Sequence, residues 1–406
     1  FESLADGGAG VRIFGPDVAA PDQGSTPLTA NRVSRNLEPE YIAVAGGTAY
    51  VTLQEANAFA IVDLASAAVT AVHPLGVKPY YSGVTLDASD RDPQGAPTYN
   101  QSSYYDLYGM YMPDGIQAYE VNGETYLVTA NEGDAREWGD YTDTARVSDL
   151  GEDGLAPICE NAAVGTHLDD AELGRLNIAT DMGLNADGTC YNSLYTFGGR
   201  GFSVWDTDGN RMFDSNADFE RITHDANPDF FNSNHSESNL EGRSDDKGPE
   251  PESLDIGRID GRTYAFIGLE RVGGVMTYDI TDPENATYAG YVNNRDFSVS
   301  VEDELTGDEA ADRALLSQAG DLGPEGVEFI PAESSPTGRP LVAVGNEVSG
   351  TTTVFAVDDP TVKNIDILTI NDFHGRLEAT QGEAGAAVIA GAVKAKEAAK
   401  DRKSVV

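Results

Sequence analysis

Positive charge, cysteine and long apolar runs are all scarce in this sequence of 406 residues. It has 26 Lys and Arg against 68 Asp and Glu, which gives a formal net charge of −42. Such an acid excess repels the phosphates of nucleic acids and anionic membrane surfaces, so we expect no nucleic acid partner. No apolar run reaches the roughly 20 residues that span a membrane as a helix, so we expect no membrane insertion.

The chain has two cysteines, Cys159 and Cys190. In a secreted protein they could pair across the segment between them, whereas in a cytosolic protein they would stay reduced. Helical periodicity is also scarce, because it is nearly absent before the end of the chain. With 40% hydrophobic residues, 18 Tyr and 14 Phe, the sequence nevertheless predicts a folded core, and one that is built from strands.

A strand cassette recurs along the chain. Each copy consists of an acidic residue, an alternating strand, a Gly-containing turn, a second apolar strand, a glutamate and a third strand. Asn122-Gly123 and Asp260-Gly261 are strong hairpin signals between apolar runs. Antiparallel units of this size favour a β-propeller over a sandwich, with about five blade-like units present. Four copies occupy residues 38–63, 113–132, 251–279 and 324–357, and a weaker copy occupies 193–214.

The acidic positions of the cassette predict a cation site. In a propeller, equivalent positions of successive blades face the same axial region. Carboxylates gathered there stay ionised only with cations among them, and an oxygen-only ligand set favours Ca²⁺ over Zn²⁺. The alternative is that each acid satisfies a turn amide or a neighbouring arginine. The acids are Glu40, Glu55, Asp114, Glu132, Glu252, Glu270, Glu325 and Glu347.

Four basic residues lie within or beside these acidic segments: Arg136, Arg200, Lys247 and Arg271. They could act as catalytic residues that bind phosphate oxygens beside a metal, or they could form simple ion pairs. The first interpretation is an analogy with calcium-dependent phytase propellers, in fold and residue type only.

Two other patterns are weaker metal signals. Residues 206–210 imitate a calcium loop, but the glycine comes too early and the closing glutamate is missing, so we predict a hairpin turn there. Residues 224–246, which include His224 and His235, predict a long surface loop.

Near the end of the chain, an apolar strand over residues 367–370 leads into Asn371-Asp372-Phe373-His374-Gly375. A carboxylate and an imidazole two residues apart at a strand's end can converge on one cation. The alternative is a helix-capping Asp372 with a solvated His374, since residues 384–400 are alanine-rich and have a helical period.

Six segments together resemble the choice-of-anchor I family of propeller domains, from about Gly10 to Val357. This resemblance implies a secreted protein of the alkaline-phosphatase-like kind, often followed by a 5′-nucleotidase module. Family members usually begin with further blade-like sequence, so we expect the first blade or two to be missing here. The six segments are residues 37–44, 51–58, 130–137, 197–200, 244–252 and 265–271.

The segment around Asp372 and His374 resembles the opening motif of calcineurin-like metallophosphatases, in the form typical of 5′-nucleotidases. The resemblance covers about residues 364–400. It implies that the two side chains bind a divalent transition metal such as Zn²⁺ or Mn²⁺, together with ligands that do not follow in this sequence.

These observations predict a β-propeller over residues 1–360, with about seven blades in the full-length parent. Residues 363–406 are expected to form a strand and helix of a truncated α/β metallophosphatase domain. The expected function is that of a fragment of a secreted metal-dependent phosphoesterase, acting on a phosphate monoester or nucleotide and completed by the rest of its own polypeptide. The alternative is a non-catalytic, calcium-binding interaction module of the cell surface or matrix.

The expected location is secreted, periplasmic or cell surface, with Cys159 and Cys190 bridged. The sequence leaves the oligomeric state open.

Overall fold

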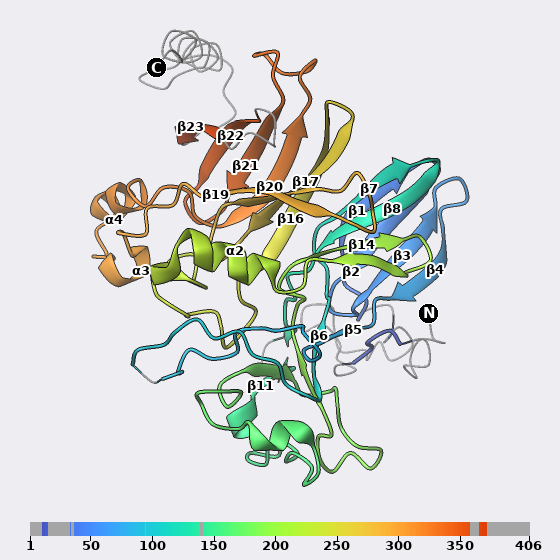
Figure 1. The fold of residues 1–406 in the computed structure, drawn as a ribbon, viewed down its shortest axis with the longest axis vertical. Helices are drawn as coiled ribbons and strands as arrows, with labels where there is room; N and C mark the ends of the chain where they lie inside the picture. Colours follow the sequence, from blue (N-terminus) through green and yellow to red (C-terminus); the bar gives the residue numbers. More distant parts are fainter. Residues whose placement is uncertain are drawn as a thin grey trace, which may run out of the picture.

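The computed structural model describes residues 10–14, 33, 36–93, 95–138, 141–357 and 365–371. Within them, four antiparallel sheets of four strands each follow one another along the chain (Figure 1). A three-stranded sheet, two two-stranded sheets and a few short helices complete the described residues. The predicted all-β class is therefore confirmed, whereas the predicted number of propeller blades is not.

The first sheet has the strand order β1-β2-β3-β4 and holds the first cassette. Its hairpin turns at Gly46-Gly47, where Gly46 has a positive φ of 59°. The strands are β1 (Pro39–Ala45), β2 (Thr48–Leu53), β3 (Ala58–Asp63) and β4 (Ala68–Pro74).

The second sheet has the order β15-β14-β8-β7 and joins two sequence units that we counted separately. The second cassette supplies β7 and β8, and the weaker copy supplies β14 and β15, because β14 pairs directly with β8. Asn122 and Gly123 both have positive φ, as a two-residue hairpin turn requires. Its strands are β7 (Ile116–Val121), β8 (Glu124–Ala130), β14 (Phe202–Asp206) and β15 (Arg211–Asp214).

The third and fourth sheets, yellow to red in Figure 1, hold the last two cassettes in sequence order. The third consists of β16 (Pro251–Ile259), β17 (Arg262–Leu269), β18 (Val275–Asp279) and β19 (Thr287–Val292). The fourth consists of β20 (Pro324–Ile330), β21 (Leu341–Asn346), β22 (Thr351–Val357) and β23 (Ile365–Asn371).

Strand β23 contains the apolar run that we predicted to open a second domain. It pairs antiparallel with β22 along its whole length, as the outer strand of the fourth sheet. Asp372, His374 and the predicted helix over 384–400 lie outside the described residues. The two domain boundaries therefore stay predictions.

A long insertion separates β8 from β14. Cys159 and Cys190 form a disulfide within it, as predicted. The insertion also contributes β13 to a three-stranded sheet in which β13 runs parallel to β6. The strands before the insertion are β5 (Val77–Pro79) and β6 (Leu107–Met110). The strands of the insertion are β9 (Glu137–Trp138), β10 (Tyr141–Thr142), β11 (Thr144–Arg146), β12 (Asn177–Ala179) and β13 (Leu194–Thr196).

The helices are short. Helix α2 packs the buried Phe219 and Ile222 against the second and third sheets. No helix in the described part of the chain is both long and apolar enough to cross a membrane. The α-helices are α2 (Asp218–Ala226), α3 (Val301–Glu304) and α4 (Glu309–Leu316), and the 3₁₀ helices span Val147–Asp149, Ala163–Thr166 and Pro228–Phe230.

Apolar cores lie between neighbouring sheets. Phe59 and Trp205 share the core between the first and second sheets. Phe202 and Ile267 share the core between the second and third. Between the third and fourth, the rings of Phe266 and Phe329 stack with centroids 5.6 Å apart. Each sheet therefore packs face to face with the next.

The first strands of the four sheets lie side by side. Strand β1 packs beside β7, β7 beside β16, and β16 beside β20. Between β7 and β16 the approach is close, because the Gly115 amide donates to the Glu252 carbonyl at 2.9 Å. In this row of strands, β1 keeps Tyr41, Ile42 and Val44 exposed.

Candidate functional site

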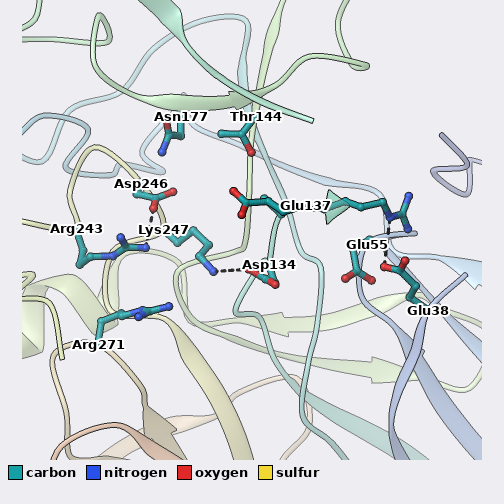
Figure 2. A pocket seen from close by; sticks show the side chains of 12 residues that line it. Glu38, Glu55, Asp134, Glu137, Thr144, Asn177, Arg243, Asp246, Lys247 and Arg271 are labelled. Carbon is teal, nitrogen blue, oxygen red and sulfur yellow. Dashed lines mark hydrogen bonds and ion pairs between the residues drawn. The ribbon is translucent and has the colours of Figure 1, made fainter. Parts of the chain in front are cut away.

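A polar cavity of about 430 Å³ opens between the first strands and the loops that follow the second strands (Figure 2). Acidic and basic side chains line it in nearly equal number, and few apolar groups reach it. Its lining consists of Glu38, Glu55, Asp134, Ala135, Arg136, Glu137, Thr144, Asn177, Arg243, Asp246, Lys247 and Arg271.

Glu250 organises the basic side of this cavity from behind. It is fully buried. Its carboxylate accepts from Arg243 at 2.6 and 2.8 Å, from Lys247 at 2.9 Å and from Arg271 at 3.1 Å. Burial alone would raise the pKa of Glu250, but these three positive charges hold it well below its usual value. Glu250 is therefore a permanent anion that fixes three cations in place.

Lys247 also binds the predicted ligand Glu132. Its ammonium lies 3.0 Å from Glu132 Oε1 and 3.3 Å from Asp134 Oδ1. Although burial lowers the pKa of Lys247, the charges of Glu250 and Glu132 raise it well above its usual value. Glu132 accepts a second hydrogen bond, of 2.7 Å, from Gln54. Lys247 and Glu132 therefore neutralise each other's charge.

Arg271 links Glu250 to a third carboxylate. Its guanidinium lies 3.1 Å from Glu270 Oε1 and donates to His235 Nδ1 at 2.8 Å. His235 Nδ1 also lies 3.4 Å from Glu270 Oε1, so the imidazole contacts both members of this pair.

Two of the four predicted phosphate-binding residues, Arg200 and Arg136, bind acidic side chains and backbone carbonyls of the protein itself. Arg200 lies behind the cavity and is fully buried, where it donates to Glu220 at 2.6 Å and to three backbone carbonyls. Arg136 does line the cavity, but it donates to the carbonyl of Asn36 at 3.0 Å and to Glu38 at 3.3 Å. Lys247 and Arg271 face the cavity with Arg243, which the sequence reading missed.

Glu55 faces Glu38 on the opposite wall. Figure 2 shows the two carboxyl groups side by side. Arg136 Nε donates to Glu38 at 3.3 Å. Burial, followed by the charge of Glu38, raises the pKa of Glu55 to about 9. One of its oxygens, Oε2, has no hydrogen-bond partner. Glu55 therefore interacts with Glu38 and Arg136, and not chiefly with the other predicted ligands.

The acids that open the first strands form a separate group, which we call the central acid set: Glu40, Asp114, Glu252 and Glu325. Their convergence shows at Tyr41, whose pKa is raised to about 12, first by burial and then by the charges of all four. Burial and neighbouring carboxylates raise the pKa of Asp114 to about 8 and that of Glu252 to about 10. Among the described residues, no basic side chain forms an ion pair with these four carboxylates.

Glu270 and Glu347 extend this set. Glu270 is the largest charged influence on Glu252, and its charge, after burial, also raises the pKa of Glu347. Ligand atoms of Glu270, Glu347 and His235 lie within 4.8 Å of one another, as do oxygens of Glu132, Glu250 and Glu270. The structure thus gathers the predicted acids of the second, third and fourth cassettes, together with Glu40.

Several of these partners escaped the sequence reading. Glu250 stands in Pro249-Glu250-Pro251-Glu252, where the cassette pattern drew attention to Glu252 alone. Arg243 and His235 fall in the predicted surface loop over 224–246. That prediction is wrong, because Asn232, Glu241 and other polar residues of this loop are fully buried. By contrast, the predicted hairpin over 206–210 is confirmed by the pairing of β14 with β15.

Two curated proteins resemble part of the chain. Gigasin-3a from Magallana gigas is 34% identical over 195 residues, which cover 46% of this chain and 66% of that protein. The mesenchyme-specific cell surface glycoprotein of Strongylocentrotus purpuratus is 29% identical over 250 residues, which cover 53% of this chain and 31% of that protein. The chain therefore spans less than two thirds of either relative.

Solved structures add little. A Bacteroides fragilis protein described as a 6-phosphogluconolactonase is 13% identical, and the match covers 82% of this chain and 70% of that protein's chain. The TM-score of 0.29 is too low to support a conclusion.

The family comparison is decisive. The choice-of-anchor I domain matches residues 5–283, well over half of the sequence. The chain therefore belongs to the choice-of-anchor I domain family, and with it to the extracellular or surface proteins.

Proposed function

We propose that the described residues form an extracellular calcium-binding module, in which the four sheets are blades of a β-propeller and the central acid set binds the cation. The observation that carries this proposal is the meeting of four carboxylates, Glu40, Asp114, Glu252 and Glu325, which form no ion pair with a base among the described residues. Asp114 is buried and Glu252 is half-buried, where an ionised carboxylate is costly unless a cation neutralises it, whereas Glu40 and Glu325 are exposed.

The available donor atoms favour calcium. Among the described residues, His235 is the histidine grouped with these acids, and its ring nitrogens lie 2.8 and 3.4 Å from the Arg271 guanidinium. Glu250 and Glu132 are held by basic side chains. The acceptors that remain are carboxylate oxygens, and Ca²⁺ takes six to eight oxygen ligands whereas Zn²⁺ prefers nitrogen and sulfur.

The location agrees with this proposal. A disulfide between Cys159 and Cys190 is typical of secreted and surface proteins. The Strongylocentrotus purpuratus relative carries cell surface in its name. Among secreted, periplasmic and cell surface locations, this favours the last.

Calorimetric titration with Ca²⁺ tests the proposal. We expect wild-type protein to bind Ca²⁺ and Glu252→Gln to bind it at least about tenfold more weakly, because one carboxylate ligand is lost. Glu309→Gln changes an exposed acid on α4 and serves as the control. Absence of calcium binding by wild-type protein would refute the proposal.

A second candidate, phosphate monoester hydrolysis, is favoured by one observation. Lys247, Arg271 and Arg243 line the same cavity as several carboxylates, an arrangement that can receive phosphate oxygens beside a cation. The 5′-nucleotidase-like activity, with Zn²⁺ or Mn²⁺ at Asp372 and His374, stays a prediction from sequence alone.

Hydrolysis of p-nitrophenyl phosphate and of AMP separates the two candidates. Calcium-dependent turnover that Glu252→Gln abolishes would support catalysis by the propeller. Turnover that needs Mn²⁺ or Zn²⁺ and survives Glu252→Gln would point to the metallophosphatase segment. Complete inactivity would leave the binding module.

A further inference from the structure

A second group of buried acids lies away from the cavity, where three segments meet. Asp87 belongs to the loop between β5 and β6, Glu220 to α2, and Glu241 to the loop after α2. All three are almost completely buried. We call them the buried acid cluster, and none of them belongs to the central acid set.

Only one of these acids is neutralised by a base. Glu220 accepts from the Arg200 guanidinium at 2.6 Å. Within the described residues, neither Asp87 nor Glu241 forms an ion pair with a lysine, arginine or histidine. Burial and then the charge of Glu220 raise the pKa of Asp87 to about 7, and burial and then the charge of Asp87 raise that of Glu241 to about 9. Two of the three carboxyl groups therefore lack a balancing positive charge among the described residues and can ionise only if a cation joins them.

The same place holds acceptor oxygens without donors. Glu241 Oε2 accepts a hydrogen bond from the Ser244 hydroxyl, while Glu241 Oε1 has no hydrogen-bond partner among the described residues. The Asn232 amide donates to Glu220 and to Ser244, and Asn232 Oδ1 likewise has no partner in the described part of the chain. Both side chains are fully buried, and buried acceptors are rarely left unsatisfied.

The loop between β5 and β6 repeats this arrangement. Gln101 donates its amide to Glu220 Oε2 at 2.7 Å, and its own Oε1 is without a partner. Asp92 Oδ2 is also buried without a partner. The side-chain amides of Gln101 and Asn232 thus donate to Glu220. Their own carbonyl oxygens, and one carboxylate oxygen each of Glu241 and Asp92, have no hydrogen-bond donor among the described residues.

From these contacts we propose that Asp87, Glu241 and Asn232 bind a second cation, a structural Ca²⁺ that is buried beside the Arg200–Glu220 pair. Gln101 and Asp92 offer further oxygens. Leftover oxygens from carboxylates and amides are the ligands that Ca²⁺ prefers. The ion would clamp the loop between β5 and β6 to residues 231–246, and it would satisfy acceptors that the protein itself does not.

The competing explanation is a proton shared between Asp87 and Glu241. The two explanations predict opposite results for Glu241→Gln. A glutamine mimics a protonated glutamate, so with a shared proton the variant would be as stable as wild type or more stable, whether or not calcium is present. With a bound cation, the variant loses a ligand and is less stable than wild type only when calcium is present.

Metal content and melting temperature therefore test the site. After dialysis against trace Ca²⁺, we expect Glu241→Gln to contain one equivalent of calcium fewer than wild type, by plasma mass spectrometry. Its melting temperature should fall below that of wild type in calcium and match or exceed it in EDTA. Glu252→Gln is the matched control, because it changes only the central acid set and should keep the buried equivalent.

Equal calcium content in Glu241→Gln and wild type would overturn this proposal, even if Glu252→Gln loses calcium. Should Glu241→Gln fail to fold, hydrogen exchange of the wild-type protein replaces it. Calcium should slow exchange in residues 231–246 and in the loop between β5 and β6. Exchange in these segments that is the same in calcium and in EDTA would also overturn it.

Discussion

Glu250 shows how far a single buried residue determines the geometry of the cavity. It holds Arg243, Lys247 and Arg271 through short contacts. We expect Glu250→Gln to lower the free energy of unfolding by roughly 3–5 kcal/mol, because three cations lose their common anion. Urea denaturation measures this change.

The matched control is Glu309→Gln, which removes an exposed carboxylate 3.0 Å from Arg313. Exposed pairs of this kind contribute about 0–1 kcal/mol. A similar small effect at both positions would contradict the role assigned to Glu250.

The central acid set predicts a pH dependence. The pKa of Asp114 is raised to about 8 and that of Glu252 to about 10, whereas in an unfolded chain both titrate near pH 4. Between these values the folded protein binds more protons than the unfolded chain, so its stability decreases as pH rises. In EDTA, the melting temperature should fall from pH 5 to pH 9.

The double variant Asp114→Asn and Glu252→Gln removes the two acids and should show a flatter profile over the same range. Saturating calcium should flatten the wild-type profile as well. A wild-type profile that rises with pH in EDTA would contradict the raised pKa values.

Sequence reasoning found these acids through their position in the cassette. It could not find that Lys247 and Arg271 bind Glu250, because the pairing depends on how the loops before β16 and after β17 fold together. Nor could it separate Arg200, which is bound to Glu220 on α2, from the cations that line the cavity. From the sequence, a charged residue can be proposed as a site residue, but its ion-pair partner depends on how the surrounding segments pack.

At the scale of strands, the contact between β7 and β16 brings two central acids together. A Cβ added at Gly115 would lie 2.7 Å from the Glu252 carbonyl oxygen, too close for the backbones to stay in place. We therefore expect Gly115→Ala to destabilise the protein by about 1–3 kcal/mol and to weaken calcium binding.

Gly326 occupies the equivalent cassette position in β20, and a Cβ there meets nothing within 4 Å. Gly326→Ala should therefore leave stability and calcium affinity nearly unchanged. Equal effects of the two alanines in denaturation and calorimetry would show that the β7–β16 contact does not matter.

The disulfide belongs to the insertion between β8 and β14. Cys159 and Cys190 are 31 residues apart, and a crosslink of that span stabilises by about 3–4 kcal/mol in the chain-entropy model. Replacing both by alanine should speed hydrogen exchange in residues 143–193 and leave the third and fourth sheets unchanged. Uniform loss of protection across all four sheets would contradict a local role.

Individual strands were easier to predict than the sheets to which they belong. Alternation and Gly-containing turns located β1, β2, β7, β8, β16 and β17, because these signals are local. The sequence did not reveal that β8 pairs with β14, since some 70 residues separate these strands and the pairing depends on packing. Helix α2 was missed because it spans nine residues, Asp218–Ala226, too few for a clear helical period.

For the whole molecule, the dominant electrostatic property is the net charge of −42. Self-repulsion destabilises a compact acidic chain, and bound or condensed cations relieve it. Monovalent salt also screens surface charges, so it should raise the melting temperature modestly. EDTA should not change this effect of salt, because EDTA removes only divalent cations. Only site-bound calcium should depend on Asp114 and Glu252.

The most direct test of the account is thermal denaturation of the wild-type protein in EDTA and in millimolar Ca²⁺, at constant ionic strength and pH 8. At 100 times its dissociation constant, a site-bound ion stabilises by about 2.7 kcal/mol, which raises the melting temperature of a chain of this size by about 3–4 °C. The account predicts such a rise with Ca²⁺ in the wild-type protein and a clearly smaller rise in Glu252→Gln, which keeps only the buried ion. Identical melting curves in EDTA and Ca²⁺ would contradict it.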